Sequence, residues 1–234
     1  MELDAPARAI DLGCGPGNST AVLAARWPGA ELSGLDSSAE MLAKARRDGP
    51  AVEWVQGDIG CWLVEERRHY ELVFSNAALQ WVPRHGAVFP RLLDRVAPGG
   101  ALAVQMPAGS DIPAQRLIRQ MAAAPQWRAR FTAPPVDWRT EPPGFYYDAL
   151  AARAARLEIW ETEYLHVMEG PEAILAWYSG SGLRPFLHAL STEDDRAEYL
   201  AEYLERLRPC YPAQADGRVL FPFRRLFLVA YLAS

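Results

Sequence analysis

Residues 10–20 have the sequence IDLGCGPGNST, in which an acid, Asp11, follows a short apolar run and glycines recur at every second position. The apolar run predicts the end of a buried strand. The polar residues after the last glycine predict a helix start, because Asn18, Ser19 and Thr20 are residue types that cap helices. A strand, a glycine turn and a helix N-terminus in this order present bare backbone and unpaired N–H groups to a ligand. The stretch therefore predicts a cofactor-binding loop, with an ordinary glycine turn of an α/β protein as the alternative.

The spacing of Gly13, Gly15 and Gly17 separates this loop from the dinucleotide-binding fingerprint G-x-G-x-x-G. In that fingerprint the third glycine comes one residue later, and the acid at the strand end is a further difference. A nicotinamide-dependent oxidoreductase is therefore the least favoured function, although Asp36 alone would permit it.

The composition limits the class of protein. The 234 residues are half apolar, enough for one large α/β domain or a core with a helical cap. No apolar run reaches the roughly 18 uncharged residues of a membrane span, and the start at Met1 lacks a signal sequence, so we expect neither a membrane partner nor export. The three cysteines (Cys14, Cys61 and Cys210) lack C-x-x-C spacing. They predict a reduced, cytoplasmic protein with neither disulfides nor a metal site.

The charge pattern narrows the choice of partner. The formal net charge is −5 and no basic block stands out, which argues against nucleic acid as a partner. Lys44 is the only lysine, so arginine is nearly the only cation available to hold an acidic small-molecule substrate. The sequence makes no prediction of the oligomeric state.

Apolar strand-like segments alternate with helical ones along the first half of the chain. Further strands are predicted at about residues 31–35, 51–56, 70–74, 101–106, 157–164 and 225–232, and helices at about 21–27, 38–47, 85–95, 113–123, 171–179 and 193–208. Alternation with short loops predicts a parallel, doubly wound sheet. The last strand is the most apolar, so we expect it in the sheet interior.

The composition changes after Pro107. Residues 108–145 carry six prolines with tryptophan and phenylalanine between them, which predicts short helices and aromatic-lined loops folded back over the sheet. We predict a cofactor-binding core over residues 1–110 and a substrate-side segment over 111–157. The remaining core strands lie in 158–234, with a helical cap inserted at about 170–212.

Acids also follow the second and third predicted strands. Asp36 comes about 20 residues after the glycines, where a carboxylate binds both hydroxyls of a ribose. The alternative is a helix N-cap, a role open to Asp36 or Ser37. Met41 follows one helical turn later and is predicted to pack against an adenine ring or in the core. Asp58 after the third strand is by itself only a turn signal.

The acid-x-G-x-G-x-G pattern resembles the first motif of the class I S-adenosylmethionine (SAM)-dependent methyltransferases. In that family the glycine loop passes under the methionine part of SAM. An Asp at the third strand end accepts from the adenine amino group, and the next backbone N–H meets a ring nitrogen. The resemblance implies SAM as cofactor, S-adenosylhomocysteine as product, and a cofactor site of Asp11, Gly13, Cys14, Gly15, Gly17, Asn18, Asp36, Ser37, Met41, Asp58, Ile59, Asn76, Ala77 and Trp81.

Three narrower blocks extend the resemblance toward the C-terminus: QWVP at 80–83, VQMP at 104–107 and GLRP at 182–185. They are similar to a subgroup of the family that methylates a carboxylate of a small polycarboxylic acid. The resemblance implies a Rossmann-like sheet of seven strands in the order 3-2-1-4-5-7-6, mostly parallel with the last strand antiparallel, and a small helical cap. It also implies a helical segment before the first strand that helps to cover SAM, whereas ten residues precede Asp11. Either SAM is more exposed here, or the cap or a partner chain supplies the lid, or the coding start lies further upstream.

A carboxylate acceptor is ionised at neutral pH and needs no general base, so catalysis reduces to positioning. We predict that Arg184 and Arg218 hold carboxylates, with turn-stabilising salt bridges as the alternative for both. The residues predicted to shape the acceptor pocket are Gln80, Trp81 and Tyr146, with His166 as a weaker candidate. Trp81 has core packing as its alternative.

Two other functions stay open at this point. One is a methyltransferase for another small-molecule acceptor, such as a hydroxyl or carbon of a secondary metabolite, which would need a base such as His166 or His188. The other is a protein that binds SAM without transferring its methyl group, and formation of a methylated product separates it from both enzymes.

Overall fold

The computed structural model describes residues 3–109, 111–136 and 138–234, so Met1 and the predicted domain boundary at residue 110 lie outside the described residues. The chain forms two compact units. Unit 1 consists of residues 1–108, 140–162 and 225–234, and unit 2 consists of residues 109–139 and 163–224. Residues 111–139, part of the predicted substrate-side segment, thus share a unit with the helices predicted as a cap.

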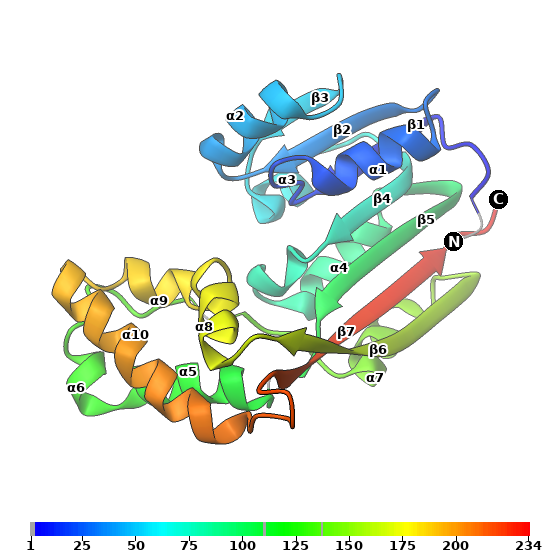
Figure 1. The fold of residues 1–234 in the computed structure, drawn as a ribbon. Helices are drawn as coiled ribbons and strands as arrows, with labels where there is room; N and C mark the ends of the chain where they lie inside the picture. The colour runs from blue at the N-terminus through cyan, green and yellow to red at the C-terminus, as the bar shows by residue number, and fades with distance from the viewer. Residues whose placement is uncertain (1–2, 110, 137) are drawn as a thin grey trace. The chain divides into compact units, whose positions relative to one another are not determined.

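A sheet of seven strands in the order β3-β2-β1-β4-β5-β7-β6 confirms the predicted topology (Figure 1). Strands β3, β2, β1, β4 and β5 are parallel to one another, and β7 pairs antiparallel with β5. β7 lies between two strands, as its apolar sequence predicts. The strands are β1 (Arg8–Leu12), β2 (Glu31–Asp36), β3 (Glu53–Gln56), β4 (Tyr70–Asn76), β5 (Val96–Pro107), β6 (Arg156–Met168) and β7 (Val219–Tyr231).

Helices cover both faces of the sheet in unit 1, which explains why β1 is buried on both sides. Leu23 and Trp27 of α1 pack on one face, whereas α3, α4 and α7 pack on the other, and Figure 1 shows α1 in front of the sheet and α4 behind it. The helices of unit 1 are α1 (Asn18–Arg26), α2 (Ala39–Asp48), α3 (Ile59–Glu65), the short 3-10 helix η1 (Leu79–Trp81), α4 (His85–Leu93) and α7 (Pro143–Leu150).

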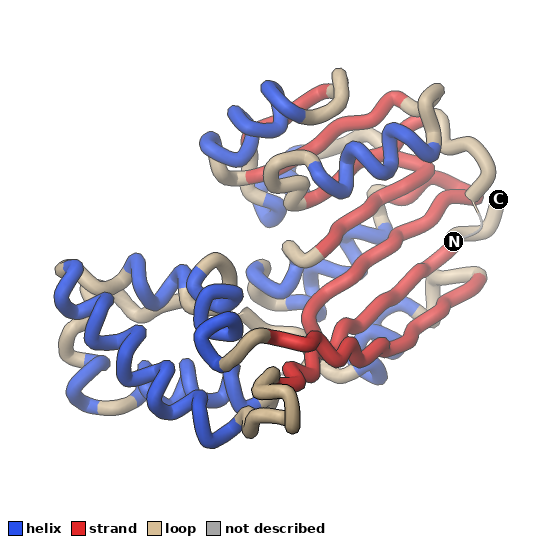
Figure 2. Tube along the Cα trace, in the orientation of Figure 1, coloured by secondary structure: helices blue, strands red, loops and turns tan. Residues whose placement is uncertain are grey.

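Unit 2 has its own aromatic core. Tyr199, Tyr203 and Leu207 recur at four-residue spacing on α10, so one apolar stripe faces α5 and α8. The hydroxyl of Tyr203 donates a hydrogen bond to the carbonyl of Ala114 at 3.1 Å, which links α10 to the start of α5. Its helices, the blue coils at the lower left of Figure 2, are α5 (Pro113–Ala123), α6 (Pro125–Arg128), α8 (Pro171–Ser179), α9 (Arg184–His188), α10 (Glu193–Leu207) and η2 (Arg208–Cys210).

Several element boundaries differ from the predictions. Helices α3, α7 and α9 were not predicted, because each has eight residues or fewer and lacks a full helical repeat in its sequence. β5 begins at Val96, five residues before the predicted start at residue 101, and within this extension Gly99 takes a φ of 72° and its N–H donates to the carbonyl of Ala233 at 2.9 Å. Within the part of the chain that the structure describes, no helix combines the length and the apolar character needed to cross a bilayer.

Candidate functional site

The carboxyl ends of β1, β2 and β4 meet at one edge of the sheet in unit 1. Asp11 pairs with Gly34 of β2 and with Phe74 of β4, and all three strands are parallel. The loops after these strands therefore begin side by side, at the edge where open α/β sheets bind ligands. Asp36 and Asn76 end β2 and β4 at this edge, as the sequence predicts.

Hydrogen bonds tie the glycine loop after β1 to the end of β2. The N–H groups of Gly13 and Cys14 donate to the carbonyl of Leu35 at 2.7 and 3.0 Å. The N–H of Gly15 donates to the Asp36 carboxylate at 2.8 Å. The loop is thus a tight turn whose backbone is held against the second strand.

The three loop glycines have different reasons to be glycine. All have positive φ, at 74°, 55° and 90°, which disfavours side chains. A Cβ on Gly13 would lie 2.1 Å from that of Ala78, and one on Gly17 would lie 2.8 Å from the ring of Trp54. A Cβ on Gly15 would meet no atom of the described residues within 4 Å. The backbone at Gly15 therefore borders open space, which suits the close approach of a cofactor.

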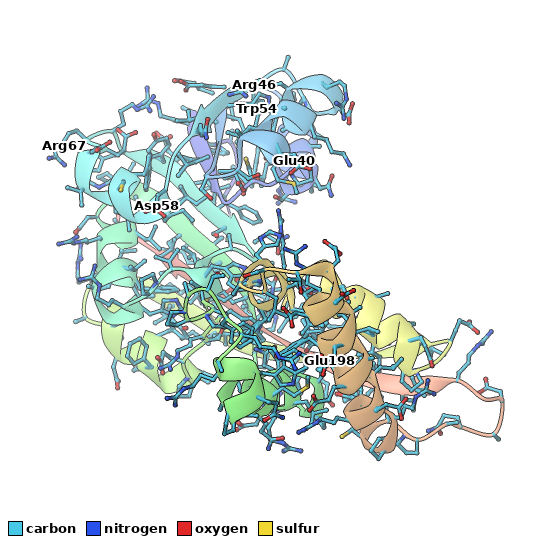
Figure 3. All side chains as sticks on the ribbon, turned by 90° about the vertical axis from the view of Figure 1, so that its left-hand side faces the viewer. Glu40, Arg46, Trp54, Asp58, Arg67 and Glu198 are labelled. Carbon is cyan, nitrogen blue, oxygen red and sulfur yellow. The ribbon has the colours of Figure 1, made fainter. Side chains whose placement is uncertain are left out.

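Trp54 of β3 explains the packing role of Gly17. Its ring also lies where side chains on Gly34 and Gly49 would project, at 2.6 and 3.0 Å. The neighbouring Arg46 on α2 donates to the Trp54 carbonyl at 3.0 Å (Figure 3). Gly17 was predicted as a residue of the cofactor site. The Trp54 ring shows that it must also be glycine for packing, which the spacing of the glycines does not reveal.

Asp11 organises the first turn of α1 from inside the protein. Its side chain is fully buried, and one carboxylate oxygen accepts from the hydroxyls of Ser19 at 2.7 Å and Thr20 at 2.6 Å. The prediction that Asn18, Ser19 and Thr20 cap the helix is wrong: the N-cap residue is Gly17, and the two hydroxyls bind Asp11 instead. The other oxygen, Oδ1, is buried without a hydrogen-bond partner in the described residues.

Burial raises the pKa of Asp11 to about 6, although the hydrogen bonds from Thr20 and Ser19 act in the opposite direction and Asp36 adds a repulsion. A carboxylate without water pays a large desolvation cost, which the two hydroxyls offset only in part. Asp11 therefore holds the first turn of α1 through two hydrogen bonds and keeps a carboxyl group buried next to it.

The carboxylate of Asp36 accepts two backbone hydrogen bonds. Besides Gly15, the N–H of Ser38 donates to it at 2.8 Å. The alternative prediction, that Asp36 or Ser37 is the N-cap of α2, is wrong. The N-cap is Ser38, whose side chain accepts from the N–H of Met41. A carboxylate has about four acceptor positions, so Asp36 keeps capacity for the hydroxyls of a ribose. Met41 is half-buried in the first turn of α2.

Asp58 and Ile59 form the start of α3. The Asp58 side chain accepts from the N–H of Cys61 at 3.0 Å and caps the helix; Figure 3 labels it. Asp58 is exposed, and its second oxygen is left for a donor such as an amino group. Ile59 is the first helical residue, whose N–H has no acceptor within the helix. The pair thus offers one acceptor and one donor, as adenine recognition requires.

The end of β4 and the segment after it hold Asn76, Ala77, Gln80 and Trp81. Ala77 has a positive φ of 56°, and its N–H donates to the carbonyl of Gln105 on β5 at 2.9 Å. The amide nitrogen of Gln80 donates to the Ala77 carbonyl at 2.7 Å, so Gln80 is buried and folds back on its own loop. Trp81 is half-buried and Asn76 is exposed.

A buried histidine and a buried tyrosine form hydrogen bonds that hold this segment in place. One ring nitrogen of His85, Nε2, lies 2.9 Å from the carbonyl of Leu79, and the other, Nδ1, lies 2.7 Å from the hydroxyl of Tyr146. A carbonyl only accepts, so Nε2 carries the proton and Nδ1 accepts from Tyr146. The Tyr146 hydroxyl also accepts from the N–H of Glu141 at 2.9 Å. Sequence reasoning missed His85, because no local pattern reports a contact that spans 61 residues.

These contacts favour a packing role for Tyr146, which is fully buried. Burial raises the pKa of its hydroxyl far above the usual range, so it stays protonated. The predicted role of Tyr146 in shaping the acceptor pocket stays a prediction.

The other residues predicted for the acceptor lie in unit 2. His166 is half-buried among aromatic rings, with its ring centroid 4.8 Å from that of Trp177. Arg218 is exposed and forms an ion pair with Glu169 at 3.3 Å, which supports the turn-stabilising alternative. Arg184 is exposed at the start of α9, and no described residue forms an ion pair with it.

The chain is similar to known methyltransferases. Residues 9–100 match the family described as methyltransferase domain. The chain is 47% identical to trans-aconitate 2-methyltransferase of Azoarcus sp. strain BH72, over 98% of this chain and 89% of that protein. It is 50% identical to the enzyme of the same name from Methylobacterium nodulans, over 98% and 88%. The crystal structure of YcgJ from Bacillus subtilis has the same fold, with a TM-score of 0.62 at 13% identity, over 100% of this chain and 94% of YcgJ.

The raised pKa of Asp11 has a consequence for stability. A carboxyl group whose pKa is higher in the folded chain stabilises the fold fully below its unfolded pKa, near 3.8, and loses that contribution as the pH rises through about 6. Asp11→Asn cannot ionise and keeps an oxygen for Ser19 and Thr20. We expect the free energy of unfolding of the wild type, relative to Asp11→Asn, to fall by up to about 3 kcal/mol between pH 4 and 7. Urea unfolding across this range measures it, and a difference that does not change with pH would contradict the raised pKa.

The Tyr146 hydroxyl gives a second prediction. Tyr146→Phe leaves Nδ1 of His85 and the N–H of Glu141 without a partner, so we expect the free energy of unfolding to fall by about 1–3 kcal/mol. The KM of the acceptor should stay within about twofold, because the hydroxyl is buried and already bound to His85 and Glu141. Tyr147→Phe, at a neighbouring side chain that is 56% exposed, is the control and should change neither. A rise in KM at unchanged stability would instead support the predicted pocket role.

Proposed function

The chain belongs to the trans-aconitate 2-methyltransferase family of SAM-dependent methyltransferases, and from this we propose that it transfers the methyl group of SAM to a carboxylate of trans-aconitate. The observation that carries the proposal is the 47% identity to a trans-aconitate 2-methyltransferase over nearly the whole of both chains. The open space beside Gly15, at the carboxyl edge of the sheet, supports it.

We propose that SAM lies along the carboxyl ends of β1, β2 and β3. Gly15 gives the methionine part room, and the Asp36 carboxylate keeps acceptor positions for the ribose hydroxyls. Asp58 and the N–H of Ile59 offer the acceptor and donor that an adenine ring needs. The other residues proposed for this site are Asp11, Gly13, Cys14, Gly17, Asn18, Ser37, Met41, Asn76, Ala77 and Trp81.

When bound, SAM supplies a methyl group on a positively charged sulfur, which an ionised carboxylate accepts without giving up a proton. The residues of the chain therefore need not supply a base. Their task is to hold the acid so that one carboxylate oxygen faces the methyl carbon, and to hold the carboxylates that do not react. Exposed Arg184, which has no ion pair with a described residue, is the proposed anchor in unit 2. Arg218 is a weaker candidate, since Glu169 already neutralises it.

A small acidic molecule is the proposed partner in the reaction, and we expect neither nucleic acid nor a membrane to take part. The net charge of −5 supports this. We also propose that the protein acts in the cytoplasm, and the free thiols of Cys14, Cys61 and Cys210 are consistent with a reducing compartment.

The first test is calorimetric titration of the purified chain with SAM, followed by mass spectrometry after trans-aconitate is added. We expect SAM to bind and the acid to gain the mass of one methyl group in place of a proton. Binding without a methylated product would leave a SAM site with another acceptor or none. No binding of SAM would contradict the proposal.

The second test concerns Arg184. A charge-assisted hydrogen bond is worth about 1.5–3 kcal/mol, so Arg184→Ala should raise the KM of the acid at least about tenfold. Arg208→Ala is the matched control, because this exposed arginine of unit 2 already pairs with Glu172 and Glu205 and should leave KM unchanged. If KM in Arg184→Ala stays within about twofold of the wild type, Arg184 does not anchor the acid.

A further inference from the structure

Gln105 lies on β5 at the edge of the sheet where β4 ends. It pairs with Asn76, the last residue of β4, and its carbonyl accepts from the N–H of Ala77. The side chain of Gln105 is only 7% exposed. Gln105 belongs to the VQMP block at 104–107, and no role was predicted for it.

An arginine from the far end of the chain reaches this glutamine. Arg225 of β7 stands opposite Pro107 of β5, and Phe227 stands opposite Gln105, so all four side chains lie on one face of the sheet. Arg225 donates from Nη1 to Oε1 of Gln105 at 3.0 Å. Arg225 is half-buried. The pairing of β5 with β7 thus joins an amide and a cation that are 120 residues apart.

The other half of the Gln105 amide, Nε2, is buried with no hydrogen-bond partner among the described residues. The orientation of the amide is set by its neighbour, because turning it over would point N–H groups at the donors of Arg225. A buried N–H without an acceptor costs about 1–3 kcal/mol, so a ligand that satisfies it gains that energy. The unpaired group is a donor, and the charge beside it is positive.

A donor beside a guanidinium matches an anion with two oxygens. We propose that Gln105 and Arg225 form a subsite that holds a carboxylate of the methyl acceptor. This inference rests on the proposed function for the identity of the acceptor, and it names one place where the acid is held. Both residues of the subsite belong to unit 1.

The carboxylate held there is one that does not react. An oxygen that accepts from a guanidinium and an amide has its charge stabilised, which makes it a poorer nucleophile for the methyl carbon. Because the carbonyl of Gln105 binds the N–H of Ala77, the subsite is tied to the loop proposed to face SAM. Gln105 and Arg225 therefore position the acid beside the cofactor.

Gln80 is also buried with one unpaired amide atom, and it serves as a contrast. Its nitrogen is bound to the Ala77 carbonyl, so the unpaired atom is the oxygen, Oε1. An oxygen repels a carboxylate and accepts from a donor instead. Gln80 is therefore not part of the proposed subsite, because its unpaired atom cannot donate to a carboxylate.

The test measures the affinity for trans-aconitate of the chain saturated with S-adenosylhomocysteine, so that no methyl group is transferred. Gln105→Glu keeps the shape and the acceptor for Arg225 but replaces the N–H with a carboxylate oxygen. Arg225→Gln removes the cation. Both should bind trans-aconitate at least about tenfold more weakly than the wild type and SAM within about twofold, since one charge-assisted contact is worth about that factor.

Arg224→Gln is the matched control. It makes the same chemical change one residue earlier on β7, where the side chain points to the opposite face of the strand, and it should leave both affinities unchanged. If Arg225→Gln fails to fold, Gln105→Glu carries the test, because its size and its contact with Arg225 are preserved.

The outcomes separate this inference from the proposed function. If the wild type methylates trans-aconitate and Gln105→Glu binds the acid as the wild type does, the subsite is overturned and the function stands. If the wild type forms no product but binds trans-aconitate in a way that depends on Gln105 and Arg225, the function is overturned and the subsite stands. If the wild type with bound S-adenosylhomocysteine does not bind trans-aconitate, both are overturned.

Discussion

The hydrogen bonds from the glycine loop to the end of β2 are the constraint on which the rest of the candidate site depends. Gly13 and Cys14 share one carbonyl acceptor, that of Leu35, and Gly15 uses the Asp36 carboxylate. These bonds require a backbone with positive φ, which only glycine adopts at little cost. They draw the loop against β2 and set the acid at the end of β2 beside the space next to Gly15. A glycine turn without these acceptors would leave the loop and the acid unconnected.

Buried polar atoms without a hydrogen-bond partner indicate positions in unit 1 that have a role beyond stabilising the fold. Asp11 is buried with one oxygen that no described residue pairs with, and Gln80 and Gln105 each have one such amide atom. Buried polar atoms almost always have partners, so each exception calls for an explanation. The unpaired atoms of the two glutamines are of opposite kinds, an acceptor and a donor. This difference assigns them to different ligand groups, and the cation of Arg225 strengthens the assignment for Gln105.

Much of the fold was predictable, because strand and helix patterns report burial directly. The acid at the end of β1, the glycines and the acids after β2 and β3 lie where the sequence placed them. Helix α7 escaped prediction because its N-cap Pro142 and its first residue Pro143 are consecutive prolines, which predict a loop. The capping role expected of Asn18, Ser19 and Thr20 failed because the helix already begins at Asn18, so Gly17 holds the N-cap position and the hydroxyls of Ser19 and Thr20 donate to Asp11.

By itself, the sequence determined the order of strands and helices, the glycine loop and the acids that follow the strands. Each of these depends on residues close together in the chain, where periodicity and turn chemistry act. Only the tertiary structure decided which side chains meet across the fold. His85 with Tyr146, and Gln105 with Arg225, are 61 and 120 residues apart, and the packing of α4 with α7 and of β5 with β7 brings them together. No local pattern encodes such pairs, because long-range packing selects them.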